Sequence, residues 1–133
     1  MEKIKQVLSK VIDRIPVLDG EGEEIVKQAL VLPVLEAMEY NVWLPNEVSM
    51  NYKVSLPDNE EETISIAVLE DGSPEILILV KPAGASLAGS EKDLLKIYGA
   101  CESASLGIVT NGAEWCFYSD TVSRHSIDRK SVV

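Results

Sequence analysis

Apolar residues recur every three or four positions in the first forty residues, which is the spacing of amphipathic helices. The pattern predicts one helix over residues 3–14 and a second from about residue 23 to residue 38. Pro16 and the stretch "LDGEG" (18–22) separate the two helices. Pro33 falls inside the second pattern. Because proline cannot donate the backbone hydrogen bond of a helix interior, we expect this helix to be kinked or shortened there.

From residue 48 onward the apolar period changes to two, which is the period of a β-strand with one buried face. Residues 48–56 alternate in this way, and two further strands are predicted at 63–69 and 75–80. Because short connections join the three strands, we expect them to pair as an antiparallel meander. The third strand, "EILILV", contains five consecutive aliphatic residues, which is typical of a strand covered on both faces.

The last third of the chain predicts a helix and two more strands. The helix covers residues 91–103, and strands at 106–110 and 114–119 flank a turn. Asn111-Gly112 in this turn is a strong signal for a hairpin. The final residues alternate only weakly, so they predict either a short edge strand or a frayed tail.

The whole chain, residues 1–133, is predicted to form one domain. The element order α-α-β-β-β-α-β-β indicates a mixed α/β fold, with an N-terminal helix, a core at about residues 21–120 and a short C-terminal tail. A domain of 133 residues buries roughly 68% of its unfolded surface, so its core needs neither metal nor disulfides. Cys101 and Cys116 form neither a disulfide framework nor a zinc pattern. We therefore expect reduced, partly buried thiols.

The sequence carries no sign of membrane insertion or export. Its apolar runs fall short of the roughly 18–20 residues that span a bilayer. The first ten residues, "MEKIKQVLSK", are charged and helical, and they lack the apolar region of a signal peptide. We therefore expect a cytoplasmic protein that does not bind membranes.

Negative charge is concentrated in the middle of the chain. The net charge is −10, and residues 19–75 carry fourteen acidic and two basic side chains, a net of −12. Proteins that bind nucleic acid tightly present a basic face to the phosphates. This charge pattern disfavours strong nucleic-acid binding and favours a protein partner or a homo-oligomer.

Four stretches of the sequence resemble one protein family. They are "EEIVKQALVLPVLEAMEYNV" (23–42), "ILILVKP" (76–82), "DLLKIYGA" (93–100) and "LGIVTNGAEWCFYSD" (106–120). Over about residues 21–120 the chain is similar to the N-terminal domain of type I restriction enzyme R subunits, within the PD-(D/E)XK nuclease superfamily. The pattern "TNG-x-x-W-x-F-Y" is the most specific part, because no simple periodicity requires those identities. The resemblance implies a restriction-endonuclease-like mixed β-sheet flanked by helices.

Enzymes of this family hydrolyse phosphodiester bonds with Mg²⁺, and the resemblance assigns positions to that chemistry. The family's helix glutamate matches Glu23 (or Glu24), and its motif lysine matches Lys81. The two carboxylates that hold the metal would fall on Ser65 and Leu79. Magnesium is held by hard oxygen ligands that include one or two carboxylates, and neither Ser65 nor Leu79 supplies one.

The degenerate positions favour an inactive module over an enzyme. One serine hydroxyl and one helix carboxylate are too few hard ligands for Mg²⁺, so we expect no metal or other cofactor. Asp93 or Leu94 also replaces a glutamine that the family has in its late helix. Lys81 is then a strand-end lysine whose ammonium reaches water. The chain is predicted to act by protein binding or regulation in a restriction, defence or counter-defence system, alone or in a larger complex.

Two alternatives stay open. A relocated metal site would combine Glu23, Glu62 and Lys81 with Mg²⁺, because the acidic turn before the second strand should lie near Lys81. An acidic module could instead mimic DNA and occupy a nucleic-acid-binding protein. The two tryptophans, Trp43 and Trp115, are expected in the core or at its rim.

Overall fold

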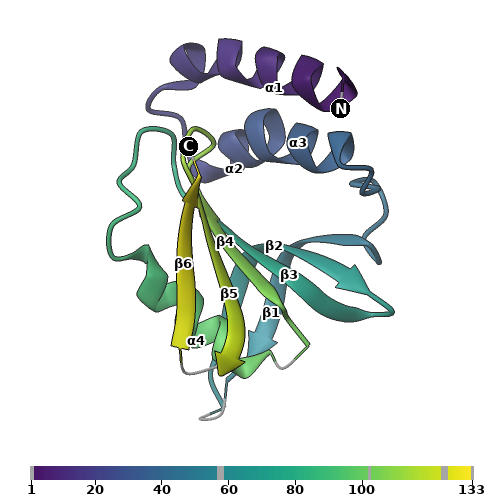
Figure 1. Ribbon diagram of the computed structural model, residues 1–133, viewed down its shortest axis with the longest axis vertical. Helices are drawn as coiled ribbons and strands as arrows, with labels where there is room; N and C mark the ends of the chain where they lie inside the picture. The colour runs from purple at the N-terminus through teal and green to yellow at the C-terminus, as the bar shows by residue number, and fades with distance from the viewer. Residues whose placement is uncertain (1, 57–58, 102, 124–125, 133) are drawn as a thin grey trace.

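A twisted β-sheet lies between helices on its two faces in the computed structural model (Figure 1). The structure describes residues 2–56, 59–101, 103–123 and 126–132, with side chains for all of these except residues 2, 3, 91 and 120–132. On one face, α1 (Glu2–Arg14) continues into the 3₁₀ turn η1 (Ile15–Leu18). Below it, α2 (Glu23–Val26) passes through one π-helical segment, η2 (Lys27–Val31), into α3 (Leu32–Ala37). The other face is covered by α4 (Ser90–Ala100).

The strands follow one another across the sheet in chain order. They are β1 (Val48–Ser55), β2 (Glu61–Glu70), β3 (Ser73–Val80), β4 (Leu106–Thr110), β5 (Trp115–Ser123) and β6 (Ser126–Val132). Neighbouring strands are antiparallel except β3 and β4, which are parallel. Parallel neighbours need a long crossover rather than a hairpin, and the segment that contains α4 provides it.

Two apolar cores lie on opposite faces of the sheet, and we name them by the helix that covers each. The α3-side core is formed by buried residues of α1, α2, η2 and α3 against the sheet: Val11, Val26, Leu30, Val31, Leu35, Val48, Ile66, Val68, Ile78, Val80 and Ile108. The α4-side core includes Leu94, Ile97 and Tyr98 of the helix. Leu77 and Ile78 face opposite cores and both are 0% exposed. This explains the continuous aliphatic run of β3, as predicted for a strand covered on both faces.

Pro33 lies in the first turn of α3, and the chain stays helical from Glu23 to Ala37, so the helix is not shortened there. The π-helical segment η2 precedes it, and α3 begins one residue earlier, at Leu32. Because Pro33 has no N–H, the carbonyl of Ala29 loses the donor that an α-helix would supply four residues later. Arg14 of α1 donates its Nη1 to this oxygen at 2.8 Å. This hydrogen bond joins α1 to the second helix beside Pro33, and α1 also packs on α3.

The turn between β4 and β5 is held by its own side chains. The Thr110 hydroxyl donates to the Glu114 carbonyl at 2.8 Å and accepts from the Gly112 N–H at 2.9 Å. The Asn111 Oδ1 accepts the N–H groups of Ala113 and Glu114 at 3.0 and 2.8 Å. Asn111 also donates its Nδ2 to the carbonyl of Ala85 at 2.8 Å, in the connection that follows β3.

Gly112 is the tightest point of the same turn. Its φ is 93°, a conformation that glycine adopts without steric cost. The space where a Cβ would stand is already filled by Leu30 and Val26 from the helix above. The Thr-Asn-Gly identities thus follow from the geometry of one buried turn that packs against η2 and α2.

Most elements predicted from periodicity are confirmed, including the antiparallel meander of β1, β2 and β3. The helix predicted at 91–103 is shorter and ends at Ala100. The final residues form the edge strand β6 rather than a frayed tail. Cys101 is half-buried and Cys116 is buried, as expected for the thiols.

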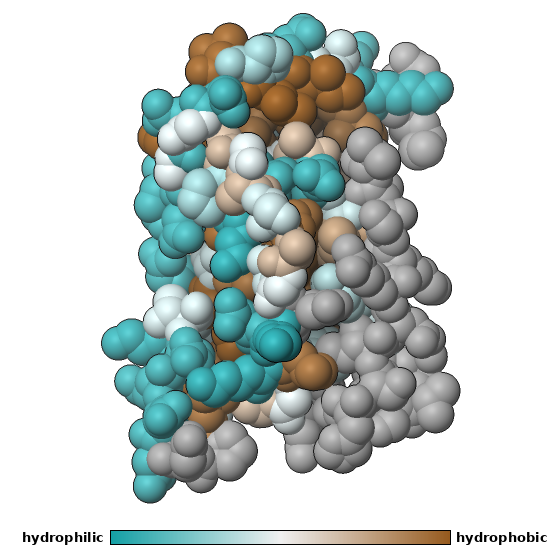
Figure 2. All heavy atoms as spheres, turned by 90° about the vertical axis from the view of Figure 1, so that its left-hand side faces the viewer, coloured by the Kyte–Doolittle hydropathy of each residue, from teal (hydrophilic) through white to brown (hydrophobic). Residues whose placement is uncertain are grey.

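Some apolar residues remain on the surface at the helical end of the molecule, where Figure 2 shows them above a mostly hydrophilic face. Ile12 in α1 is 62% exposed and Val17 in η1 is 80% exposed. Trp43, expected in the core or at its rim, is 79% exposed, because it lies in the connection from α3 to β1 beyond the sheet. Trp115 is half-buried against the α3-side core. Within the described part of the chain, no helix is both long and apolar enough to cross a membrane.

Candidate functional site

Ser65, to which the sequence resemblance assigns an aspartate position, lies in β2 and is 7% exposed. Its Oγ accepts the backbone N–H of Val80 in β3 at 2.9 Å. Backbone pairing between the two strands runs to Ile66 and Ile78, so this bond joins β2 and β3 just beyond their paired region. The hydroxyl therefore has a structural partner of its own.

Leu79, to which the sequence resemblance assigns a glutamate position, packs against the α4-side core. The aliphatic run of β3 predicts cover on both faces, but the exposure of Leu79 itself is intermediate. The residue lies near the end of β3, where the apolar cover is incomplete. The side chain at this position is therefore aliphatic and takes part in the packing of the sheet.

Leu79→Ala is expected to lower the free energy of unfolding by about 1–2 kcal/mol. Full burial of the leucine would raise this loss to about 2–5 kcal/mol, and the partial exposure of Leu79 reduces it. Leu77→Ala, two residues earlier on the same face and 0% exposed, is the matched control and should show the larger loss. Denaturant unfolding of both variants measures the difference. Equal losses would show that Leu79 is as buried as Leu77.

Lys81 follows β3, and its side chain is 27% exposed. Its Nζ lies 3.9 Å from the carboxylate of Asp93 in α4, one of the two residues to which the sequence resemblance assigns a glutamine position. Asp93 is 69% exposed, so water screens this ion pair and its contribution to stability is about 0–1 kcal/mol. Lys81 is therefore a partly buried lysine at the end of a strand, with an exposed carboxylate beside its ammonium.

The acidic turn before β2 lies beside α4. Glu60 and Glu62 approach the Nζ of Lys96 at 3.6 and 3.3 Å. The hydrogen bond to Glu62, and then the charge of that carboxylate, raise the pKa of Lys96 above its ordinary value of 10.5. A raised lysine pKa favours folding below pH 10.5, and this contribution is lost as the pH rises through the folded-state pKa. Glu62, a candidate metal ligand, therefore already has a cationic partner.

Glu23 lies at the start of α2 and is exposed. None of the hydrogen bonds and ion pairs recorded for the described residues joins it to Ser65, Leu79, Lys81 or Glu62. Among those same residues, no three Asp, Glu, His or Cys side chains are grouped so that they could hold a metal ion. The structure therefore does not bring the predicted ligands of a relocated metal site together.

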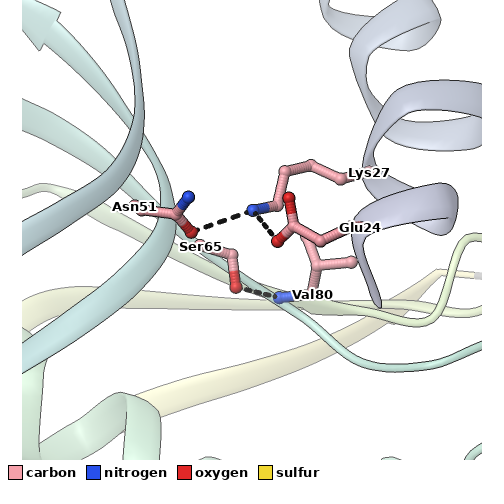
Figure 3. A network of polar contacts seen from close by, with 5 residues as sticks. All are labelled: Glu24, Lys27, Asn51, Ser65 and Val80. Carbon is pink, nitrogen blue, oxygen red and sulfur yellow. Dashed lines mark hydrogen bonds and ion pairs between the residues drawn. The ribbon is translucent and has the colours of Figure 1, made fainter. Parts of the chain in front are cut away.

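The polar centre nearest to Ser65 is formed by a lysine that the sequence analysis did not select. Lys27, in the π-helical segment η2, is 0% exposed. Its Nζ donates to the Glu24 carboxylate at 2.9 Å and to the Asn51 Oδ1 at 3.1 Å. Figure 3 shows the side chain extending from the helix toward β1, with Glu24 alongside it. Of the two helix glutamates matched by resemblance, Glu24 is the one that makes a polar contact here.

Asn51, which accepts the hydrogen bond from Lys27, lies at an irregular point of β1. Its φ is 52°, in the left-handed region that asparagine tolerates better than most residues. The flanking pairs, Met50 with Ile66 and Tyr52 with Ile64, place Asn51 opposite Ser65. Ile64 faces the α4-side core and Ile66 the α3-side core, so the strand changes face at Ser65. Lys27 therefore reaches the strand position beside Ser65.

A buried ammonium needs compensation, because removing a charge from water is unfavourable unless it is paired and hydrogen-bonded. Glu24 supplies a negative charge, and Asn51 supplies a neutral acceptor. The sequence did contain a signal for this lysine, since helical spacing places Lys27 on the same face as Val26, Leu30 and Val31. A single lysine within an apolar face is either at its border or buried with partners, and the partner Asn51 is distant in sequence.

Comparison of the chain with protein-family models, with curated proteins and with solved structures finds no match. The chemistry of the site therefore rests on its own geometry. Ser65 lies in β2, Leu79 in β3 and Lys81 directly after β3. Each already has a partner within the protein: the N–H of Val80, the α4-side core and Asp93, respectively. A hydroxyl bonded to the backbone, an alkyl chain and an exposed lysine lack the acceptors that hold a divalent metal.

Proposed function

We propose that this chain is a catalytically inactive, restriction-endonuclease-like module that acts by binding a protein partner. The observation that carries the proposal is the pair Ser65 and Leu79, which replace both metal-holding carboxylates of the family that the sequence resembles. Ser65 binds the N–H of Val80, and Leu79 packs against the α4-side core. Each residue is thus integrated into the fold and has no need of a metal.

Lys27 supports the same proposal. Its Nζ donates a hydrogen bond to Asn51, at the strand position opposite Ser65, and lies 2.9 Å from the Glu24 carboxylate. A nuclease of this family would concentrate negative ligands there in order to hold Mg²⁺. Lys27 forms an ion pair with Glu24 instead. The carboxylate of Glu24, which the resemblance offers as a possible ligand, therefore already has a partner.

The element order also supports a restriction-endonuclease-like architecture. A helix precedes three antiparallel strands, and α4 then crosses over to the parallel strand β4. The sequence resemblance places the family's motif on β2 and β3, and these strands are adjacent in the sheet. The net charge of −12 in residues 19–75 favours a protein partner over nucleic acid.

Plasmid nicking in Mg²⁺ or Mn²⁺ tests the inactive state directly. The wild-type protein should convert no supercoiled plasmid beyond the rate measured without protein, because two of the metal ligands are missing. Lys81→Ala is the matched control for contamination. Nicking by the wild type that disappears in Lys81→Ala would show an active nuclease and overturn the proposal.

A further inference from the structure

An apolar groove lies between α3 and the edge strand β1. It has a volume of about 380 Å³ and is lined by Gln28, Leu32, Pro33, Glu36, Val42, Trp43 and Met50. Trp43 is 79% exposed, and its indole N–H donates to the Glu36 carboxylate at 3.1 Å. Met50, on the strand side, is 37% exposed. The groove therefore combines a large aromatic surface with a flexible thioether, and both types of side chain are enriched in binding interfaces.

Trp43 is held in place although it is exposed. The Asn41 side chain accepts its backbone N–H at 3.1 Å, and the Glu47 carboxylate accepts the backbone N–H of Asn41 at 2.9 Å. Together with the bond to Glu36, these contacts fix the loop and the indole ring. An ordered ring loses little conformational entropy on binding, which makes it a good anchor.

The charges that border the groove indicate which kind of partner segment would bind there. Between residues 15 and 52 the chain carries seven acidic side chains, and its only basic one is Lys27, which is buried and paired. On the other side of the Trp43 loop, a second hollow contains Leu44 and four carboxylates, those of Glu47, Glu70, Asp71 and Glu75. Lys10 and Arg14, both in α1, line a neighbouring hollow on the far side of Glu36. Positive charge therefore lies at one border of the groove, and negative charge lies at the border with β1 and β2.

We infer that the groove binds a basic segment of a partner protein, with an apolar side chain against Trp43 and lysine or arginine side chains toward Glu47 and its neighbouring carboxylates. This inference rests on the proposed function, since it places the binding surface of the inactive module. Burial of the aromatic ring supplies most of the affinity. The carboxylates provide orientation and a fast, salt-dependent association.

Tryptophan fluorescence with synthetic peptides tests the inference. The probe is a twelve-residue peptide of alternating lysine and leucine, compared with a glutamate–leucine and a lysine–serine peptide of equal length. The lysine–leucine peptide should shift the emission to shorter wavelength with a saturable curve, and the other two should bind at least about tenfold more weakly. Trp43→Ala should weaken binding of the lysine–leucine peptide at least about tenfold, because truncation of an aromatic anchor typically has that effect. Because this variant lacks the reporting indole, the fluorescence anisotropy of a labelled peptide measures its binding.

Val17→Ala is the matched control, since Val17 is 80% exposed but lies outside the groove; it should bind like the wild type. Circular dichroism confirms that Trp43→Ala is folded. The inference is contradicted if wild type and Trp43→Ala bind the peptide equally, or if binding is not saturable. It is also contradicted if the glutamate–leucine peptide binds equally well, or if sedimentation shows that self-association explains the signal. None of these results bears on plasmid nicking, so the groove can fail while the proposed function stands.

Discussion

Gly112→Ala is expected to lower the free energy of unfolding by about 2–5 kcal/mol, from the addition of one methyl group. Alanine at a φ of 93° is strained by about 1–2 kcal/mol. The new Cβ would also overlap the Leu30 Cδ1 and lie 3.1 Å from the Val26 Cγ1. Overpacking of this kind costs about 1–3 kcal/mol. Urea unfolding followed by circular dichroism measures the loss.

Gly72→Ala is the control that separates backbone strain from steric overlap. Gly72 has a φ of 83°, and no atom lies within 4 Å of the position that its Cβ would take. The control should therefore lose only the backbone contribution of about 1–2 kcal/mol. If the two variants lost the same free energy, the β4–β5 turn would not pack against Leu30 and Val26 as described.

Lys27→Ala is expected to lower the free energy of unfolding by about 2–4 kcal/mol, whereas Lys27→Met should stay within about 1 kcal/mol of the wild type or exceed it. Alanine leaves a cavity in the α3-side core, as large-to-small changes do. Methionine fills that volume and removes the cost of burying an ammonium, an exchange that is often neutral or stabilising. Glu24 is 59% exposed, so water can solvate its carboxylate once the lysine is gone.

Asn51→Gly tests the other partner of Lys27 while allowing the φ of 52°. In the wild type it should lower the free energy of unfolding by about 1–3 kcal/mol, because a buried ammonium loses an acceptor. In Lys27→Met the same change should have less effect, since no ammonium remains, and the double-mutant cycle gives the coupling. A coupling of zero would show that the hydrogen bond between Lys27 and Asn51 does not contribute to stability.

Hydrophobic periodicity predicted most elements well, because the helices α1 to α4 and the strands β1 to β5 each bury apolar residues against a single sheet. The run from Ile76 to Val80 was interpreted correctly as a strand covered on both faces. The parallel pairing of β3 with β4 depends on the crossover through α4, whereas period-two patterns are the same in parallel and antiparallel strands. The end of α4 was misplaced because Cys101 continues the helical spacing of Leu94, Ile97 and Tyr98 after the backbone has left the helix.

The candidate site was predictable only in part. Resemblance assigned motif positions to Ser65, Leu79 and Lys81. The structure has Ser65 in β2, bonded to the N–H of Val80 in β3, and Lys81 directly after β3. The partner of Lys27 could not be found from sequence, because Asn51 is twenty-four residues away and adopts a left-handed conformation inside a strand. The exposure of Trp43 was also missed. An indole ring is usually buried, and its position outside the sheet depends on the loop that Asn41 and Glu47 stabilise.

The most direct test of the inactive site is a thermal shift with Mn²⁺ on the wild type and on the double variant Ser65→Asp, Leu79→Glu. The variant restores both carboxylates, so without metal it should melt at a lower temperature, because two nearby negative charges repel each other. Mn²⁺ that binds only the folded state should then raise its melting temperature. The account predicts a shift for the variant and none for the wild type. A saturable Mn²⁺ shift in the wild type that is lost in Glu23→Gln or Glu62→Gln would contradict it and show a relocated metal site.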